Sequence, residues 1–454
     1  MYLYTERYQA LNLEVYFMTQ ENQLRQNPLP LPKSLKRRNR PKLNIQELDA
    51  EKIESKTRAI KPGPSEPRIV SSAHGSIKHI LLCYPAYADG EYSYKQVYEN
   101  LFIKLPKTTK FTILTHPSVS NDLKASLHEA KAYSRATIVE APEFLNFLVW
   151  AEDPYVAVQD AANKSKTTFL VEPFTFTRVG DSAIAELVAD ATHVQSIQSP
   201  LYFQGGNLLI GDNFIFIGTD YPENTKNVIE QYGNIIVPED VEIDAFIKDL
   251  YSQTFDPKRK LFYIGTDLPV PQYETRPIII NGEEWTEEIY LGTGDKQPIF
   301  HIDMFISLAG RNESGKYRLV VGSPTEADKI LERSPSFHAM AEIFDDVASK
   351  LEGLGFEVIR NPLPLTYVDF PDIKYRSWYF ATANNCLVQI DKCDGNHVWL
   401  PTYGHGAWAD LAAVDAENKR IWEGLGFEVH ELADFHPFAQ NLGSVHCIKK
   451  YLER

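Results

Sequence analysis

The heptapeptide EGLGFEV occurs at residues 352–358 and again at residues 423–429, 71 positions later. Before the first copy, apolar side chains recur at the spacing of one helix face, at Met340, Ile343, Val347, Leu351 and Leu354. Gly355 can end such a helix in the left-handed conformation, and a strand over 356–360 follows. The second copy repeats this arrangement. The echo predicts an α/β protein built from duplicated strand-and-helix units, in place of one doubly wound sheet.

The same pattern is already present near residue 77. Residues 77–85 and 110–117 are apolar enough for two strands. Between them, residues 94–106 carry apolar side chains at four-residue spacing, which predicts a helix. The repeated architecture therefore extends over most of the chain.

Residues 1–70 have a different composition. The stretch NPLPLPKSLKRRNRPK, residues 27–42, is rich in proline and basic residues. Such a composition favours an irregular arm or linker over a packed domain. The basic run 36–40 predicts a solvated tail first, and a polyanion-binding or targeting segment second.

Bulk properties exclude several classes of function. The net charge of −15 argues against binding nucleic acid through its phosphates. The four cysteines are too scattered for a disulfide scaffold, and Cys386 and Cys393 are too far apart in sequence for a zinc or redox pair. No stretch approaches the roughly 20 apolar residues of a membrane span, and no signal peptide is visible. We therefore expect a cytoplasmic protein without membrane or nucleic-acid partners, and the sequence leaves a homo-oligomer open.

Four polar stretches interrupt the apolar pattern. An apolar run ending at Trp150 leads into Glu152 and Asp153, which predicts either a surface turn or a carboxylate at the end of a strand. In the second stretch, LYFQGGN, the glycine pair lets the backbone turn sharply or approach a ligand. It lacks the glycine and lysine spacing of a phosphate-binding loop.

The other two stretches contain a histidine and a cysteine. His301 and Asp303 alternate with apolar residues, which predicts two polar side chains on one face of a strand. Buried side chains of both kinds require partners. Cys447 follows a Gly-Ser pair near the end of the chain, where a turn can expose a thiol that would otherwise be an inert core residue.

In this order the stretches resemble the guanidine-modifying superfamily, the penteins, which includes arginine, agmatine and peptidylarginine deiminases and amidinotransferases. The matching segments are 150–153, 204–207, 301–303, 443–447 and the NCLVQI…VWLPTYG stretch over 385–404. The ending GSVHC is similar to the GNIHC ending of agmatine deiminases. The resemblance spans about residues 78–450.

The resemblance implies a propeller of five pseudo-repeated strand-and-helix units around a polar channel, with 71–454 as the catalytic domain. It implies Cys447 as the nucleophile, His301 as the general acid and base, and Asp153 and Asp303 as the carboxylates that hold a guanidinium. It implies further substrate contacts from Trp150, Gln204, Asn207 and Asn385. Two positions depart from the family pattern: Gln204 stands where many members have an acid, and Glu152 stands where many have arginine.

The expected reaction is hydrolysis of a guanidinium group through a covalent thiouronium adduct, giving a ureido product and ammonia. It needs no metal, and no cofactor motif is visible. An amidinotransferase would use the same adduct, and a non-catalytic binding protein of this fold remains a third hypothesis. The substrate is a small guanidine compound or peptidyl-arginine.

The sequence gives some indication of which guanidine is bound. Arg311 and Arg376 are the nearest candidates to hold the carboxylate of free arginine. The segment 273–300 can supply a lid, and its acidic residues attract a cation and repel a carboxylate, namely Glu283, Glu284, Glu287 and Glu288. This favours an arginyl or amine-bearing guanidine over free arginine.

Overall fold

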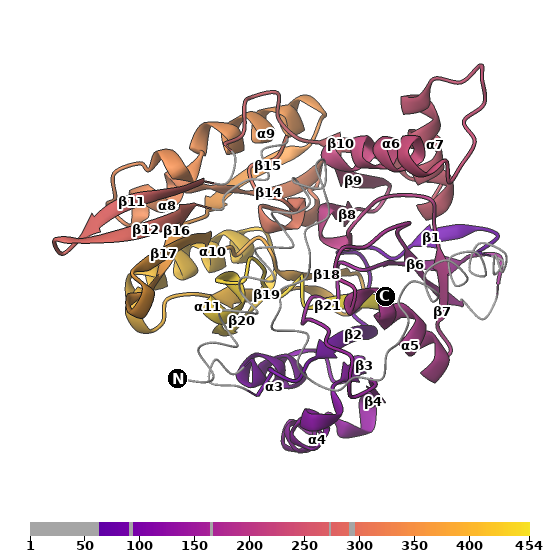
Figure 1. Ribbon diagram of the computed structural model, residues 1–454, viewed down its shortest axis with the longest axis horizontal. Coiled ribbons are helices and arrows are strands. Elements are labelled where there is room, and N and C mark those ends of the chain that lie inside the picture. The colour runs from indigo at the N-terminus through magenta and orange to yellow at the C-terminus, as the bar shows by residue number, and fades with distance from the viewer. Residues whose placement is uncertain (1–62, 90–93, 164–166, 272–273, 290–295) are drawn as a thin grey trace. The chain divides into compact units, whose positions relative to one another are not determined.

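The computed structural model describes residues 63–89, 94–163, 167–271, 274–289 and 296–454 (Figure 1). The chain divides into two compact units, residues 1–65 and 66–454. The predicted arm lies outside the described residues up to residue 62. Within its remaining range, β1 (Pro67–Ile69) is a strand of the second unit, because it pairs with β5 (Val156–Asp160).

Five sheets among the described residues share one strand pattern. The first strand runs antiparallel to the second, and a helical connection then leads to a third strand that is parallel to the second. The first three sheets are β5, β6 (Thr168–Glu172) and β7 (Gln195–Gln198); β8 (Leu208–Ile210), β9 (Phe214–Gly218) and β10 (Lys260–Ile264); and β13 (Ile306–Arg311), β14 (Tyr317–Ser323) and β15 (Glu357–Pro362). The other two are β18 (Leu387–Asp391), β19 (Gly395–Thr402) and β20 (Glu428–Asp434); and β21 (Lys449–Glu453), β2 (His79–Tyr84), β3 (Lys110–Thr115) and β4 (Ala136–Glu140).

The fifth sheet joins the two ends of the second unit. Its first strand, β21, comes from the C-terminal end, while β2 lies near the beginning of the unit. In Figure 1 these two strands have colours from distant parts of the bar and yet lie side by side. The antiparallel pair of the fifth sheet, β21 and β2, therefore consists of segments that are far apart in the sequence.

Helices connect the second and third strands of each sheet. They are α5 (Ile184–Ala191), α6 (Asp220–Tyr232) with α7 (Ile243–Phe255), α8 (Pro324–Ile330) with α9 (Ala341–Gly353), α10 (Ala412–Gly424), and α3 (Lys95–Lys104), with α4 (Ser120–Glu129) leading on to β4. The short helix α11 (His436–Ala439) precedes β21. The helices and strands predicted around residues 77–117 and 340–360 are confirmed. Among the described residues, no helix is both long enough and apolar enough to cross a bilayer.

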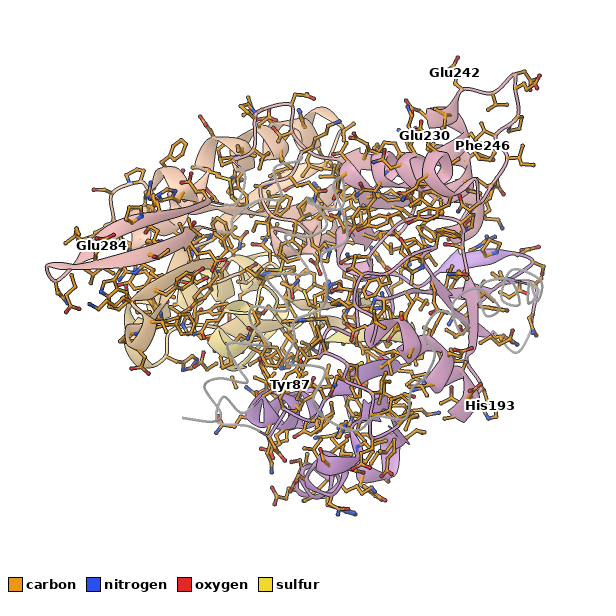
Figure 2. The ribbon with its side chains drawn as sticks, viewed as in Figure 1. Tyr87, His193, Glu230, Glu242, Phe246 and Glu284 are labelled. Carbon is orange, nitrogen blue, oxygen red and sulfur yellow. The ribbon has the colours of Figure 1, made fainter. Side chains whose placement is uncertain are left out.

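A further sheet is formed by two hairpin segments, β11 (Glu274–Ile280) with β12 (Glu283–Ile289), and β16 (Leu365–Phe370) with β17 (Tyr375–Phe380). Glu284 is exposed on β12 (Figure 2). Glu287 is buried and accepts hydrogen bonds from Arg276 Nε at 2.6 Å and from Trp378 Nε1 at 2.9 Å. The negative charge of Glu287, one of the acidic residues of the predicted lid, is therefore balanced by Arg276 within this sheet.

The repeated heptapeptide forms the same helix ending twice. After α9, Gly355 N–H donates to Glu352 O at 2.9 Å and Phe356 N–H donates to Leu351 O at 3.2 Å. After α10, Gly426 N–H donates to Glu423 O at 3.0 Å, and Phe427 N–H donates to Trp422 O at 3.1 Å. This is the Schellman arrangement, in which the glycine has positive φ: +98° for Gly355 and +87° for Gly426. The second copy adds contact between the rings of Trp422 and Phe427, whose centroids are 4.8 Å apart.

We expect Gly426→Ala to lower the free energy of unfolding by about 1–2 kcal/mol, because an L side chain is strained at this positive φ. A Cβ there would meet nothing within 4 Å, so the effect isolates backbone strain. Gly424→Ala is the matched control. Gly424 ends α10 at negative φ in equally open space, so alanine there should raise the free energy of unfolding by about 0.5–1 kcal/mol. Urea unfolding of both variants measures the difference, and equal effects would contradict the assignment of a left-handed helix cap.

Candidate active site

Each predicted site residue lies in the segment just before the first strand of one of the five sheets. Trp150 and Asp153 precede β5, Gln204 and Asn207 precede β8, His301 and Asp303 precede β13, Asn385 precedes β18, and Cys447 precedes β21. Because these strands hold equivalent places in their sheets, one rule describes the position of every residue in the site.

The strand predicted around His301 and Asp303 was wrong, because residues 302–304 form a 3₁₀ turn. Residues 147–155 contain no strand, and Glu152 and Asp153 lie in a turn that is buried and not at the surface. Cys447 also lies in a turn, directly before β21. Polar and apolar residues alternate around His301 as they do in a strand. Buried turns of this kind show the same alternation, so the pattern did not distinguish the two. The apolar neighbours, Ile302 and Met304, are buried in the turn.

Hydrogen bonds join the five turns into a closed ring. The bonds run from Glu152 N to Cys447 O (3.0 Å), from Gly205 N to Asp153 O (3.0 Å), from Ile302 N to Asn207 Oδ1 (3.0 Å), from Asn385 Nδ2 to Asp303 O (3.4 Å), and from His446 N to Asn385 Oδ1 (2.9 Å). Each turn is thus held by its neighbours on both sides, and the polar side chains are fixed relative to one another.

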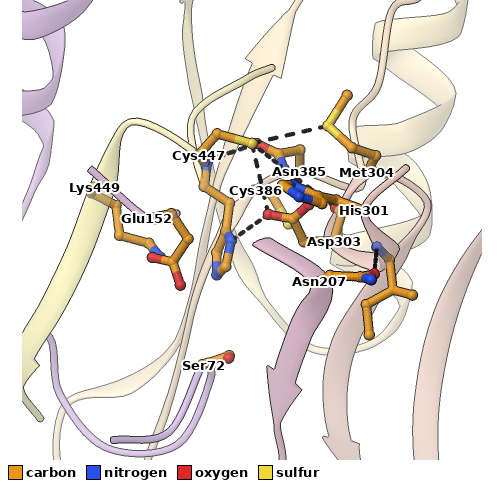
Figure 3. A network of polar contacts seen from close by, with 12 residues as sticks. Ser72, Glu152, Asn207, His301, Asp303, Met304, Asn385, Cys386, Cys447 and Lys449 are labelled. Atoms are coloured by element: carbon orange, nitrogen blue, oxygen red, sulfur yellow. Dashed lines mark hydrogen bonds and ion pairs between the residues drawn. The ribbon is translucent and has the colours of Figure 1, made fainter. Parts of the chain in front are cut away.

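Cys447 lies at the centre of a buried polar network (Figure 3). Asn385 Nδ2 donates to its Sγ at 3.1 Å, and Asp303 Oδ2 is 3.7 Å from the same sulfur. Burial raises the pKa of the thiol well above its usual value, and the negative charges of Asp303 and Asp153 raise it further. Without a bound cation, the sulfur is therefore a neutral thiol at neutral pH.

Asp303 is held on one side only. His446 Nδ1 donates to its Oδ2 at 2.8 Å, whereas Oδ1 is buried and has no hydrogen-bond partner among the described residues. Burial raises the pKa of this carboxyl well above its usual value, and Asp153 and Glu152 add to the shift. A carboxylate in this position gains most from a cation that brings hydrogen-bond donors.

His301 has one ring nitrogen paired and one unpaired. Its Nε2 is 3.1 Å from Gln204 Oε1, while Nδ1 has no hydrogen-bond partner among the described residues and is 3.8 Å from Asp153 Oδ1. Burial lowers the pKa of this histidine to about 4, so the ring is neutral at neutral pH. Gly206 lies against it: a Cβ there would be 2.4 Å from His301 Nδ1, which explains the need for glycine.

Asp153 is paired with an arginine that the sequence did not indicate. Arg178 donates from Nη2 to Asp153 Oδ2 at 2.9 Å, and its Nε is 2.7 Å from Asp181 Oδ2. The other oxygen, Asp153 Oδ1, is buried without a hydrogen-bond partner among the described residues. No local pattern signals Arg178, because its partner is 25 positions away in the chain.

Glu152 forms ion pairs with two lysines of β21. Its oxygens accept from Lys449 Nζ at 2.7 Å and from Lys450 Nζ at 2.8 Å, and all three side chains are buried. Burial lowers the pKa of Lys449 to about 8. This ion-pair cluster fastens the turn of Asp153 to the strand that follows Cys447.

Two predicted substrate contacts face protein groups. Asn207 donates from Nδ2 to Asp220 Oδ1 at 2.9 Å and accepts from Ile302 N, so both ends of its amide join parts of the scaffold. Trp150 packs on Phe438 with ring centroids 6.1 Å apart. It also covers Gly443, where a Cβ would lie 2.2 Å from the indole ring. Direct substrate contact by either residue stays a prediction.

No protein-family profile and no curated protein sequence matches the chain. Solved structures do resemble it. The agmatine deiminase of C. jejuni superposes with a TM-score of 0.53 over 85% of this chain and 96% of its own, at 11% identity. A structural-genomics target with a provisional agmatine deiminase name gives a TM-score of 0.54 over 85% of this chain and 95% of its own, at 12% identity.

The chain has the agmatine deiminase fold. The expected likeness to the pentein superfamily is therefore confirmed at the level of the mixed α/β fold.

We expect Asp303→Asn to stabilise the protein as the pH rises. Asparagine retains an oxygen for the His446 hydrogen bond but has no proton to lose. In the wild type the folded state resists ionisation of Asp303, whereas the unfolded chain ionises it near pH 4. The carboxyl therefore lowers the free energy of unfolding increasingly as the pH rises above about 4. Urea unfolding from pH 4 to 8 should show a variant-minus-wild-type difference that grows with pH, and a constant difference would contradict this.

Proposed function

We propose that the chain hydrolyses a guanidinium group by means of Cys447, releasing ammonia and leaving a ureido product. The observation that carries this proposal is a set of buried polar atoms without hydrogen-bond partners among the described residues: Asp153 Oδ1, Asp303 Oδ1 and His301 Nδ1. Buried polar atoms in native proteins are normally satisfied. Two carboxylate oxygens beside a thiol suit a planar cation with several N–H donors.

The two carboxylates would hold the guanidinium with its central carbon beside the sulfur. Cys447 Sγ attacks that carbon, and its proton passes to the neutral His301. The imidazolium then gives the proton to the departing amine, so that ammonia leaves a thiouronium adduct. His301 next takes a proton from water as the water adds to the thiouronium carbon. Collapse breaks the C–S bond and forms the ureido C=O, the hydroxyl proton of the adduct restores the Cys447 thiol, and the imidazolium gives up its proton, so that the positive charge of the substrate leaves as ammonium.

Substrate binding would activate the nucleophile. In the ligand-free site, burial and two neighbouring acids keep the Cys447 thiol protonated. A bound cation neutralises Asp153 and Asp303 and favours the thiolate. The enzyme would thus have a reactive sulfur mainly when a cation occupies the site. A free thiol of this kind suits the reducing cytoplasm that the sequence predicts.

We further propose that the five sheets are the units of a propeller around this site. Two features support the proposal: the common strand pattern of the five sheets, and the closed ring of hydrogen bonds between the turns that precede their first strands.

The arginines considered as holders of a substrate carboxylate are already paired. Arg311 forms two bonds to Asp212 (2.6 and 3.0 Å), and Arg376 forms two bonds to Asp369 (2.7 and 2.8 Å). Arg178 is shared between two aspartates. We therefore propose agmatine or a carboxyl-blocked arginyl group as the substrate in preference to free arginine.

The decisive assay incubates the full chain with agmatine, carboxyl-blocked arginine and free arginine, and measures ammonia and ureido product. Release of both from one compound supports the hydrolase. Transfer of the amidino group to an added amine without ammonia would instead show an amidinotransferase. If all three compounds bind without turnover, the chain is a binding protein and the proposed chemistry is wrong.

We expect 2-chloroacetamidine, a cation, to alkylate Cys447 at least tenfold faster than neutral 2-chloroacetamide does. Cys393 is exposed and serves as the internal control, because both reagents reach it from solvent. Asp153→Asn should reduce the preference at Cys447 and leave that at Cys393 unchanged. Peptide mass spectrometry measures both rates. The same reagent preference at the two cysteines would refute cation-assisted activation.

We expect Gln204→Glu to move the pH–rate profile toward higher pH. A carboxylate 3.1 Å from His301 Nε2 stabilises the imidazolium and raises the pKa of this histidine from about 4. Gln204→Leu is the matched control, since it removes the hydrogen bond without adding charge. Steady-state kinetics from pH 5 to 10 measures the shift, and an unchanged profile for the Glu variant would place Gln204 outside proton transfer.

A further inference from the structure

Two histidines and a glutamate meet on the surface of the fourth sheet, outside the site described above. His397 lies on β19, and Glu428 and His430 lie on β20. The strands run parallel, with His397 opposite Glu428 and Trp399 opposite His430. Since alternate residues of a strand share a face, the pleat places these side chains together.

The ligand atoms of this group are close enough for one metal ion. His397 Nδ1 is 3.1 Å from His430 Nε2. Glu428 Oε2 is 3.6 Å from His397 Nδ1, and Glu428 Oε1 is 3.7 Å from His430 Nε2. Nitrogen ligands lie about 2.0–2.1 Å from zinc, so two of them in a tetrahedral site are roughly 3.3 Å apart. The histidine pair already has nearly that spacing, and Glu428, the most exposed of the three, needs to move only slightly.

The surroundings also favour metal binding. His397 Nε2 donates to Asp394 O at 2.7 Å, which leaves the lone pair on Nδ1, the atom that faces His430. Such a bond from the second ring nitrogen to a carbonyl is typical of metal-binding histidines. Trp399 stacks beneath His430 with centroids 5.0 Å apart and limits the orientation of the ring. Among the described residues, Glu428 has no ion-pair partner apart from these two histidines.

One cation interacts with the group. Lys104 interacts electrostatically with His430, and its ammonium donates to the backbone carbonyl of Glu431. The site therefore has two imidazoles, one carboxylate and open positions that water can fill. Imidazole and carboxylate together suit borderline divalent ions such as Zn²⁺, Co²⁺ and Ni²⁺, more than Mg²⁺ or Ca²⁺.

We propose that His397, Glu428 and His430 form a binding site for a divalent transition metal ion that joins β19 to β20. The ion would act as a clip between the last two strands of the fourth sheet. Because it would bind the folded state only, it would stabilise the protein by an amount that rises with the logarithm of its free concentration above Kd. This proposal is independent of the chemistry at Cys447.

The test uses Co²⁺ alone as the probe, added to the full chain with Cys393 changed to Ser to remove the exposed thiol. We expect one Co²⁺ per chain by titration calorimetry, visible d–d bands without a thiolate charge-transfer band, and a rise in Tm. His430→Ala and Glu428→Gln should each weaken binding at least tenfold. His193→Ala, at an exposed histidine elsewhere (Figure 2), is the matched control and should bind as the parent does.

Three outcomes would overturn the proposal. They are no binding by the parent protein, undiminished binding by both His430→Ala and Glu428→Gln, and a thiolate charge-transfer band that places the ion at a cysteine. Circular dichroism of each variant without metal verifies that it is folded. Both side chains lie at the surface of the sheet. If His430→Ala nevertheless fails to fold, the metal binding of Glu428→Gln decides the test.

Discussion

The side-chain amide of Asn385 is the interaction on which the rest of the site depends. Its oxygen accepts from the backbone N–H groups of His446 and Cys447, at 2.9 and 3.2 Å. Its nitrogen donates to the carbonyl of Asp303 at 3.4 Å and to the sulfur of Cys447 at 3.1 Å. One buried amide thus uses all of its hydrogen-bonding capacity. It fixes the turn that carries Cys447 against the turn that carries Asp303.

This fixed frame allows the site to hold groups that are unfavourable in a folded protein. Asp303, His301 and Cys447 are all buried, and burial opposes the charged form of each. A looser structure would relax so that these groups could pair or reach water. Here the ring of bonds between turns prevents relaxation, and the unsatisfied capacity remains for a ligand. Pre-organisation of this kind is what a charge-stabilising site requires.

The sequence predicted those parts of the fold that have a local cause. The two EGLGFEV segments predicted repeated units because a glycine with positive φ and a following buried phenylalanine are local features of a helix ending. The order of the motifs predicted the candidate site residues, and their roles stay a prediction. The strand predicted at His301 and Asp303 was wrong, because a buried turn and a short strand share the same alternation of polar and apolar residues. The partners Arg178, Lys449 and Lys450 were missed, since only the tertiary structure brings them to Asp153 and Glu152.

The pairing of β21 with β2 has a consequence for how the molecule acquires its site. These strands come from opposite ends of the second unit, so their pairing has the greatest sequence separation of the strand pairs among the described residues. Contacts of this kind form late, because the chain entropy of closing such a long loop must be overcome first. Cys447 lies directly before β21, so its sulfur reaches Asn385 and Asp303 only when the two ends have met. The other four sheets contain neither β2 nor β21, so they can form before these two strands pair, and the surroundings of Cys447 are completed only by that pairing.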